Sequence, residues 1–171
     1  MKYKVIDNFL DKNQYDKLST YLKSEDIPWY LRKIDTRMGK TKNKNGFFSF
    51  CFYNKHEPNH NSFYEYMPPF IEKLKIGALI QIRANLTLRD IDARESAFHL
   101  DYPYKNSTTG IFYLTTCNAK TLLKLPEGKK AINSVENRML LFPTKVKHNV
   151  LYQTDVHKRY VVNFNFFGDQ W

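Results

Sequence analysis

Hydrophobic and polar residues alternate along the second half of the chain with the period of a β-strand. From Ile80 to Arg89, the even-numbered side chains are apolar and the odd-numbered ones are polar. Residues two apart on a strand project from the same face, so this segment predicts a strand with one apolar and one polar face. Further strands are predicted at Phe98–Tyr102, Thr108–Thr116, Thr121–Leu125, Arg138–Phe142 and Arg159–Phe167.

The first half of the chain carries two segments in which apolar residues recur at helical spacing. Asp11, with Gln14 three positions later, is typical of a helix N-cap with a reciprocal capping partner. Between Phe63 and Leu74 the spacing is again helical, and Pro68-Pro69 must either kink that helix or begin its second half. Short strands are expected at 4–6, 29–34 and 46–53, and a charged, turn-rich loop at 38–45.

The order of these elements, helices first and strands afterwards, favours an α+β fold. N-terminal helices would then pack on one sheet of an antiparallel β-sandwich. At 171 residues the chain is long enough for one hydrophobic core and short for two. We therefore expect a single domain over 1–171, with a helical support at about 1–76 and a β-sandwich core at about 78–168.

Composition and charge narrow the class of protein. Nothing after Met1 is typical of an export signal, and no apolar run reaches membrane-spanning length, so we expect a soluble cytoplasmic protein with no membrane partner. Cys51 and Cys117 are isolated in the sequence and are interpreted as buried free thiols. The net charge of +10 would suit a polyanionic partner, but the lysines are scattered and form no nucleic-acid-binding motif.

The sharpest local feature is His99-Leu100-Asp101, because residues two apart on a strand can hold one ion together. Such a motif also arises by chance. His148, however, follows the apolar strand Met139–Phe142 and the turn residue Pro143, where a β-sandwich would return a side chain to the motif. Two imidazoles and one carboxylate cover one face of an octahedral ion and leave positions for a chelating cosubstrate and dioxygen. A structural zinc site would instead have a closed shell.

Arg159 begins the final predicted strand, 11 residues after His148. Its guanidinium would hold a carboxylate through two parallel charge-assisted hydrogen bonds if it enters the same cavity. The alternative is an exposed residue in the charged turn after Lys158. Tyr160 and Val162 alternate on the opposite face of this strand, which favours the inward orientation of Arg159.

His99, Asp101, His148 and Arg159 resemble, in order and spacing, the pattern of the iron(II) and 2-oxoglutarate-dependent oxygenases of the prolyl-hydroxylase-like group. The segments Thr109–Leu114 and Glu136–Phe142 also look like strands of that family, and the closest likeness is to small bacteriophage and bacterial members. The resemblance covers roughly Ile80–Phe167. It implies a double-stranded β-helix, also called a jelly-roll or cupin-like β-sandwich, in the cytoplasm of a bacterial or phage-infected cell.

The resemblance also implies a chemistry and its cofactors. His99, Asp101 and His148 would bind iron(II), and Arg159 would bind the cosubstrate 2-oxoglutarate, with dioxygen as the second cosubstrate. The implied activity is a dioxygenase that couples decarboxylation of 2-oxoglutarate to succinate with hydroxylation of a small-molecule or peptide substrate, for example a peptidyl proline or another amino-acid side chain.

The resemblance does not single out the second residue that binds 2-oxoglutarate or the residues that contact the substrate. Phe112 stands where some relatives place a cosubstrate-binding tyrosine, so the second donor to 2-oxoglutarate is left open. The candidates for that donor are Asn85, Thr121 and Asn163. The candidates for substrate contact are Gln81, Arg83, Tyr102 and Tyr104, with the loop 38–45 as a lid. Each of these polar residues has an alternative role as a solvent-exposed or sheet-bonding side chain.

Two other classes of protein remain open. One is a non-enzymatic cupin-like domain, in which the same residues hold a structural metal ion or a small anion. Arg159 discriminates against this class, because a structural metal requires no carboxylate anchor. The other is a basic nucleic-acid-binding module that stacks bases on its many Tyr and Phe residues. Neither the substrate nor the oligomeric state follows from the sequence, because loops set substrate selectivity in such folds.

Overall fold

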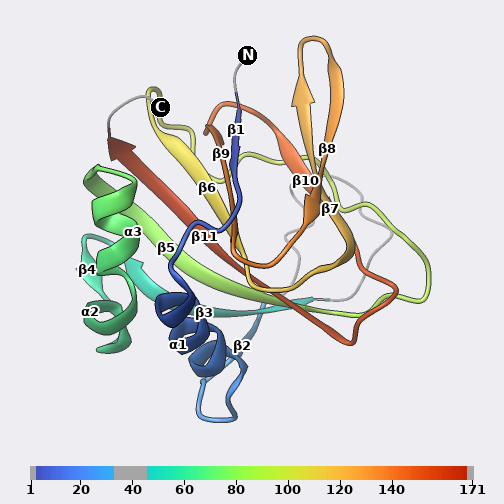
Figure 1. Ribbon diagram of the computed structural model, residues 1–171. Helices are drawn as coiled ribbons and strands as arrows, with labels where there is room; N and C mark the ends of the chain where they lie inside the picture. The colour runs from blue at the N-terminus through green and yellow to red at the C-terminus, as the bar shows by residue number, and fades with distance from the viewer. Residues whose placement is uncertain (1–2, 33–45, 169–171) are drawn as a thin grey trace.

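Two antiparallel sheets of unequal size form the framework of the protein (Figure 1). The computed structural model describes residues 3–32 and 46–168. The elements in chain order are β1 (Lys4–Ile6), α1 (Lys12–Lys23), β2 (Tyr30–Arg32), β3 (Phe47–Asn54), β4 (Glu57–Pro58), α2 (Ser62–Tyr66), α3 (Pro68–Lys73), β5 (Ile76–Leu88), β6 (Thr108–Tyr113), β7 (Cys117–Leu125), β8 (Gly128–Ser134), β9 (Arg138–Pro143), β10 (His148–Leu151) and β11 (Lys158–Gly168).

The larger sheet has eight strands, in the order β1-β9-β6-β11-β5-β3-β2 with β4 paired to β3. The smaller sheet has three strands, in the order β10-β7-β8. In Figure 1 the three helices lie on one side of the larger sheet, and β7, β8 and β10 lie on the other. The expected α+β jelly-roll sandwich with helices packed on one sheet is therefore confirmed.

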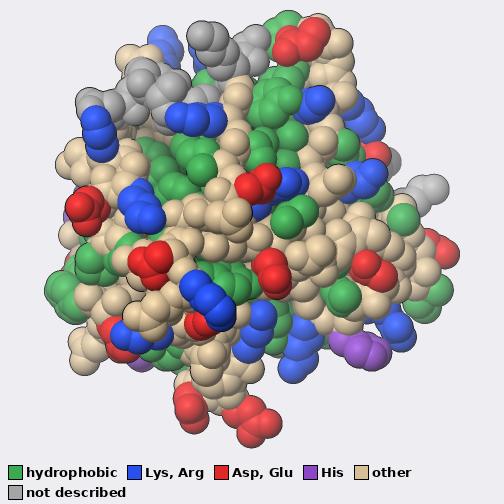
Figure 2. Space-filling model, in the orientation of Figure 1, with side chains coloured by type: hydrophobic (Ala, Val, Ile, Leu, Met, Phe, Trp, Pro, Cys, Tyr) green, Lys and Arg blue, Asp and Glu red, His purple; other side chains and the backbone are tan. Residues whose placement is uncertain are grey.

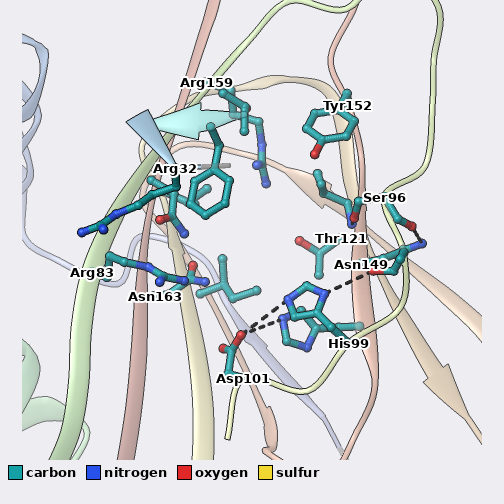
Figure 3. A pocket seen from close by; sticks show the side chains of 18 of the residues that line it. Arg32, Arg83, Ser96, His99, Asp101, Thr121, Asn149, Tyr152, Arg159 and Asn163 are labelled. Carbon is teal, nitrogen blue, oxygen red and sulfur yellow. Dashed lines mark hydrogen bonds and ion pairs between the residues drawn. The ribbon is translucent and has the colours of Figure 1, made fainter. Parts of the chain in front are cut away.

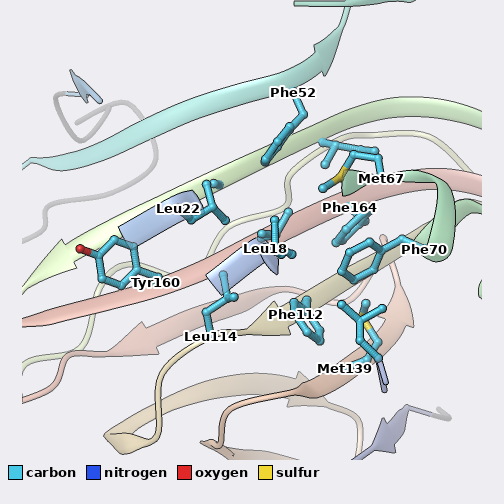
Figure 4. Packing of buried hydrophobic residues seen from close by; sticks show 14 of the residues in the cluster. Leu18, Leu22, Phe52, Met67, Phe70, Phe112, Leu114, Met139, Tyr160 and Phe164 are labelled. Atoms are coloured by element: carbon cyan, nitrogen blue, oxygen red, sulfur yellow. The ribbon is translucent and has the colours of Figure 1, made fainter. Parts of the chain in front are cut away.

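The face of the larger sheet toward the helices is a dense aromatic core (Figure 4). Phe164 of β11 and Phe112 of β6 both lie against Phe70 of α3, with ring centroids 4.7 and 5.0 Å apart. Leu18 and Leu22 of α1 complete this layer. Burying one such side chain stabilises the fold by about 1.5–3 kcal/mol, so this face holds the helices on the sheet.

Two features of the helices follow from local chemistry. The Asp11 carboxylate accepts a hydrogen bond of 2.9 Å from the Gln14 backbone N–H, so the expected N-cap is present. The expected reciprocal hydrogen bond to the Gln14 side chain is wrong, because Gln14 Oε1 is buried without a hydrogen-bond partner in the described part of the chain. Pro68 begins α3, where its missing N–H costs nothing, so the proline pair starts a second helix.

Several strand predictions need correction. The expected strand at 98–102 is wrong, because its pairing consists of a single bridge between His99 and His148. The hairpin strand β8 and the short strand β10 were not predicted. The first 76 residues also contribute strands to the larger sheet, through β1 at one edge and β2 and β3 at the other. The predicted loop 38–45 lies outside the described residues.

The structure also tests the expectations that were drawn from the cysteines, the net charge and the hydropathy of the chain. Cys51 and Cys117 are free, but both are half-buried rather than buried. On the face shown in Figure 2, Lys and Arg side chains are interspersed with Asp and Glu and do not merge into one basic surface. Within residues 3–32 and 46–168, no helix is long and apolar enough to cross a membrane.

Candidate functional site

A cavity of about 570 Å³ opens on the face of the larger sheet that points away from the helices. The odd-numbered residues of β5 and β11 line it from one side, and β10 with the segment 96–101 lines it from the other. This is the polar face that the alternation from Ile80 to Arg89 predicts. The strand pattern therefore places apolar side chains in the core and polar side chains in the cavity.

His99, Asp101 and His148 converge at one end of this cavity (Figure 3). The Nε2 atoms of His99 and His148 lie 3.5 and 3.7 Å from Asp101 Oδ1, and one ligand atom from each residue lies within 4.8 Å of the others. Paired backbone hydrogen bonds of 3.0 Å between His99 and His148 hold the two segments together. The bridge between these segments thus brings two histidines that are distant in sequence side by side.

The surroundings of these side chains fix their orientation. His99 Nδ1 lies 3.2 Å from the Ala97 carbonyl oxygen, and donation to that oxygen leaves the Nε2 lone pair facing Asp101. The Asn165 amide donates to Asp101 Oδ2 at 3.3 Å, and Thr109 in turn donates to Asn165 Oδ1 at 3.0 Å. Such outer contacts orient ligands in metal sites.

Burial and charge set the protonation states of the three side chains. Burial lowers the pKa of His148 to about 4, so this imidazole is neutral near pH 7. Burial alone would raise the pKa of Asp101, but the nearby His148 and His99 outweigh it and lower the pKa below its ordinary value. For His99, burial opposes the charged form, yet the hydrogen bond to Asp101 raises the pKa overall. The cluster therefore offers a buried carboxylate and at least one neutral imidazole.

The donor set fits a divalent first-row metal ion. Ligand atoms about 2.1 Å from such an ion lie roughly 3 Å apart at neighbouring octahedral positions. The histidine-to-carboxylate separations of 3.5 and 3.7 Å are close to that value. Because all three ligands lie on one side, a bound ion would keep free positions toward the cavity.

Arg159 lies toward the other end of the cavity and is 4% exposed (Figure 3). Its Nε donates to Ser134 Oγ at 3.2 Å, and its guanidinium lies 5.6 Å from the centre of the Tyr113 ring. The Tyr113 hydroxyl donates to Thr121 Oγ1 at 2.7 Å, and burial raises the pKa of Tyr113 to about 12, so the phenol stays protonated. No carboxylate in the described ranges pairs with Arg159. Burial lowers the pKa of the Arg159 guanidinium below its ordinary value.

The structure divides the other candidate residues into two groups. Asn85, Thr121, Asn163, Gln81 and Arg83 line the cavity. The Oδ1 atoms of the two asparagines and the Nε of the arginine are buried without hydrogen-bond partners among the described residues.

Tyr102 and Tyr104 do not line this cavity. They stack on each other, with ring centroids 5.8 Å apart, in a second hollow of about 360 Å³. Leu100 borders both spaces.

The sequence did not single out several residues around the site, among them Tyr113, Ser134 and Asn165. The signal for Tyr113 was available, because Thr109, Ile111 and Tyr113 alternate on one face of β6 while Phe112 enters the core. No local pattern indicated Ser134, which belongs to the unpredicted strand β8.

Comparison with known proteins gives similarity in structure but not in sequence. No family model and no curated protein sequence matches the chain. A 2OG-Fe(II) oxygenase family oxidoreductase from Burkholderia pseudomallei superposes with a TM-score of 0.73 at 8% identity, covering 96% of this chain and 84% of that one.

Two further solved structures have the same fold. A prolyl hydroxylase from Trichoplax adhaerens, in complex with a peptide fragment of the hypoxia inducible factor oxygen degradation domain, gives a TM-score of 0.70 at 14% identity, over 97% of this chain and 83% of that one. The epimerase SnoN, in complex with Fe3+, alpha ketoglutarate and nogalamycin RO, gives 0.68 at 8% identity, over 97% and 78%. The chain therefore has the double-stranded β-helix fold of the 2-oxoglutarate and iron(II) oxygenases, including their prolyl-hydroxylase-like members.

Proposed function

We propose that the protein is an iron(II)- and 2-oxoglutarate-dependent dioxygenase that hydroxylates a small-molecule or peptide substrate. The observation that supports this function is the presence, in one cavity, of an open two-histidine, one-carboxylate cluster and a buried arginine with no carboxylate partner in the described chain. The cluster fits iron(II), and the arginine fits the far carboxylate of 2-oxoglutarate.

In this proposal His99, Asp101 and His148 hold the iron, and the iron with its cosubstrates supplies the oxidation of a substrate C–H bond. Arg159 pairs with the far carboxylate of 2-oxoglutarate and thereby orients the molecule along the cavity. The face of the Tyr113 ring packs against the Arg159 guanidinium. The Tyr113 hydroxyl donates to Thr121 and thereby orients Thr121 near the far carboxylate of 2-oxoglutarate. The enclosed position of these groups excludes water and strengthens each ionic contact.

The roles of the remaining cavity residues follow from position. Thr121 is the better candidate for the second donor to 2-oxoglutarate, because its hydroxyl belongs to the Arg159 and Tyr113 cluster. Asn163 lies beside Arg83 in the strand register, away from Arg159. We assign Asn163 to the substrate side for this reason.

The test is an anaerobic titration of the metal-free protein with iron(II) and 2-oxoglutarate. The chelate formed by the two gives a weak visible charge-transfer band, which we expect in the wild type. His148→Ala should abolish iron binding and the band. Arg159→Gln should keep iron but weaken 2-oxoglutarate affinity by about 100-fold, since a charge-assisted bidentate contact is lost from a buried site. Succinate formation in air provides the second readout.

Arg89→Gln is the matched control, because Arg89 is exposed just beyond the end of β5, outside the residues that line the cavity. It should leave the band unchanged. A wild type that binds iron or zinc but shows no 2-oxoglutarate affinity would contradict the dioxygenase and favour the cupin-like metal-binding domain. Nucleic-acid affinity that is independent of iron and lost with added salt would favour the basic binding module.

A further inference from the structure

The cavity contains a second arginine that neither the metal cluster nor the Arg159 anchor uses. Arg83 of β5 is paired in register with Asn163 of β11, whereas Arg159 is paired with Thr87. Arg83 and Thr87 are four residues apart on one face of a strand, or about 13 Å. Figure 3 shows Arg83 on the flank of the cavity nearer Asp101 and Arg159 at a separate position. The two guanidinium groups are therefore separate candidate anion anchors.

Arg83 has no ionic partner in the part of the chain that the structure describes. Its guanidinium contacts the Phe47 ring at 5.7 Å, and its Nε is buried with no hydrogen-bond acceptor. Leaving such a donor unpaired costs stability, especially for a charged group. Arginines without carboxylate partners in a cavity are suited to bind an anionic ligand, because the ligand completes their hydrogen bonds.

The charges of the site support this argument. Arg32, Arg83 and Arg159 line the cavity, and Asp101 is the one carboxylate among the described lining residues. The charges of iron(II), Asp101, 2-oxoglutarate and Arg159 cancel when the proposed complex forms. Arg83 and Arg32 then remain without a compensating carboxylate among the described residues that line the cavity. The loaded cavity thus keeps a positive flank, which favours a substrate with negative charge.

The neighbours of Arg83 add a second requirement. Asn163 and Asn85 place buried side-chain oxygens on the same cavity face, and neither oxygen has a hydrogen-bond partner among the described residues. A carbonyl oxygen accepts a hydrogen bond, so a ligand that satisfies it must present an N–H or O–H donor. The donor must lie close to the anionic group, because Asn163 and Arg83 are side by side across two paired strands.

We propose that the substrate is a small carboxylic acid with an N–H or O–H donor next to its carboxylate, in the manner of an α-amino or α-hydroxy acid. Arg83 binds the carboxylate, and Asn163 accepts from the donor. The planar guanidinium matches a carboxylate in two parallel hydrogen bonds. The cavity volume of about 570 Å³ is in the range of small-molecule sites. This inference rests on the proposed function, because it names the substrate class of that same site.

The position of Arg83 also suits the chemistry. Arg83 lines the same cavity as Asp101 and His99, and Figure 3 shows it on the flank nearer Asp101. A carboxylate held by Arg83 would therefore lie beside the metal cluster. The carbon atoms next to that carboxylate would then be within reach of the open side of the ion.

The test compares two probes that differ mainly in charge, N-acetylglycine and its amide N-acetylglycinamide. Binding to the zinc-loaded protein with 2-oxoglutarate is measured by ligand-observed NMR titration. The wild type should bind the acid at least tenfold more tightly than the amide. Arg83→Gln should remove that preference and leave 2-oxoglutarate affinity within about twofold, whereas Arg89→Gln should leave both unchanged. Equal binding of the two probes to the wild type, or a preference that survives Arg83→Gln, overturns the inference.

Two further arms sharpen the assignment. Asn163→Ala should weaken N-acetylglycine severalfold but not acetate, which lacks the donor; equal weakening of both, or of neither, removes Asn163 from the site. Inorganic phosphate that binds more tightly than N-acetylglycine, through Arg83, would overturn the choice of a carboxylate. If the wild type binds no 2-oxoglutarate but still shows the Arg83-dependent acid preference, the anion site stands and the oxygenase proposal fails.

Discussion

The two faces of strands β5 and β11 differ in polarity and in packing. On the helix side, Ile82 and Phe164 are fully buried among aromatic rings. On the cavity side of the same strands, Arg83 and Asn163 keep polar atoms without partners in the described chain. One pair of strands therefore supplies packing on one face and binding groups on the other.

This difference separates stability from function within single strands. Apolar residues of the helix side are held by dispersion and water exclusion, so removing one leaves a void. Unpartnered polar groups on the cavity side contribute little to folding and cost something to bury. Substitutions at adjacent positions of β11 should then differ strongly in their effect on stability.

The largest expected effect tests this contrast directly. Phe164→Ala should lower the free energy of unfolding by about 3–5 kcal/mol, because the ring packs on Phe70 within a closed core. Asn163→Ala, at the neighbouring position, should leave stability unchanged or slightly higher, since it removes a buried oxygen that has no described partner. Urea denaturation of both variants measures the difference.

Phe164→Leu keeps the experiment informative if the alanine variant does not fold, and it should show a smaller loss in the same direction. A cost for Asn163→Ala as large as that for the phenylalanine change would show that the cavity face also carries the fold. The division between the two faces would then be wrong.

The division itself could largely be predicted from the sequence. Period-two alternation identified the core and cavity faces of β5, and the inward orientation of Arg159 followed from Tyr160 and Val162 on the opposite face. Alternation succeeds here because a half-buried strand must sort its side chains by polarity. The convergence of His99, Asp101 and His148 was also predicted, from their spacing and from the apolar strand and turn that precede His148, and the family resemblance supported it.

Other parts of the site lay beyond this reasoning. The segment 98–102 alternates like a strand but makes only one bridge, which depends on where β10 happens to lie. Strand β8 has four exposed residues at its start and so lacks an apolar pattern. Phe112 and Tyr113 are adjacent on β6 and therefore face opposite sides of the sheet, so an assignment shifted by one residue overlooks Tyr113.

The next prediction concerns a cavity-side residue whose hydrogen bonds are made. Asn165 lies two residues after Asn163 on the same face, but its amide contacts Asp101 and Thr109. Asn165→Ala should weaken zinc or iron(II) affinity by about tenfold, because the orientation of Asp101 is lost. Competition with a chromogenic chelator measures this affinity. Asn163→Ala is the matched control, and equal metal affinity of the two variants would contradict a positioning role for Asn165.

The smallest effect sharpens the contrast between paired and unpaired arginines. Arg138 of β9 donates to both oxygens of Asp7, at 2.6 and 3.0 Å, near the surface. The hydrogen bond from Arg138 lowers the pKa of Asp7 below its ordinary value, so the stability contributed by this pair is present above the unfolded pKa and is lost as pH falls through the folded one. Asp7→Asn should cost less than about 1 kcal/mol at pH 7, because the pair is exposed to solvent.

The difference in unfolding free energy between wild type and Asp7→Asn should therefore shrink toward zero under acid conditions, as followed by urea denaturation at a series of pH values. Arg83→Gln should show a smaller pH-dependent loss, since Arg83 has no ion pair in the described chain. A stability loss for Arg83→Gln that matches the Asp7 variant in size and pH dependence would mean that Arg83 has a structural ion pair. An arginine that stabilises the fold through such a pair would not be free to hold a substrate carboxylate.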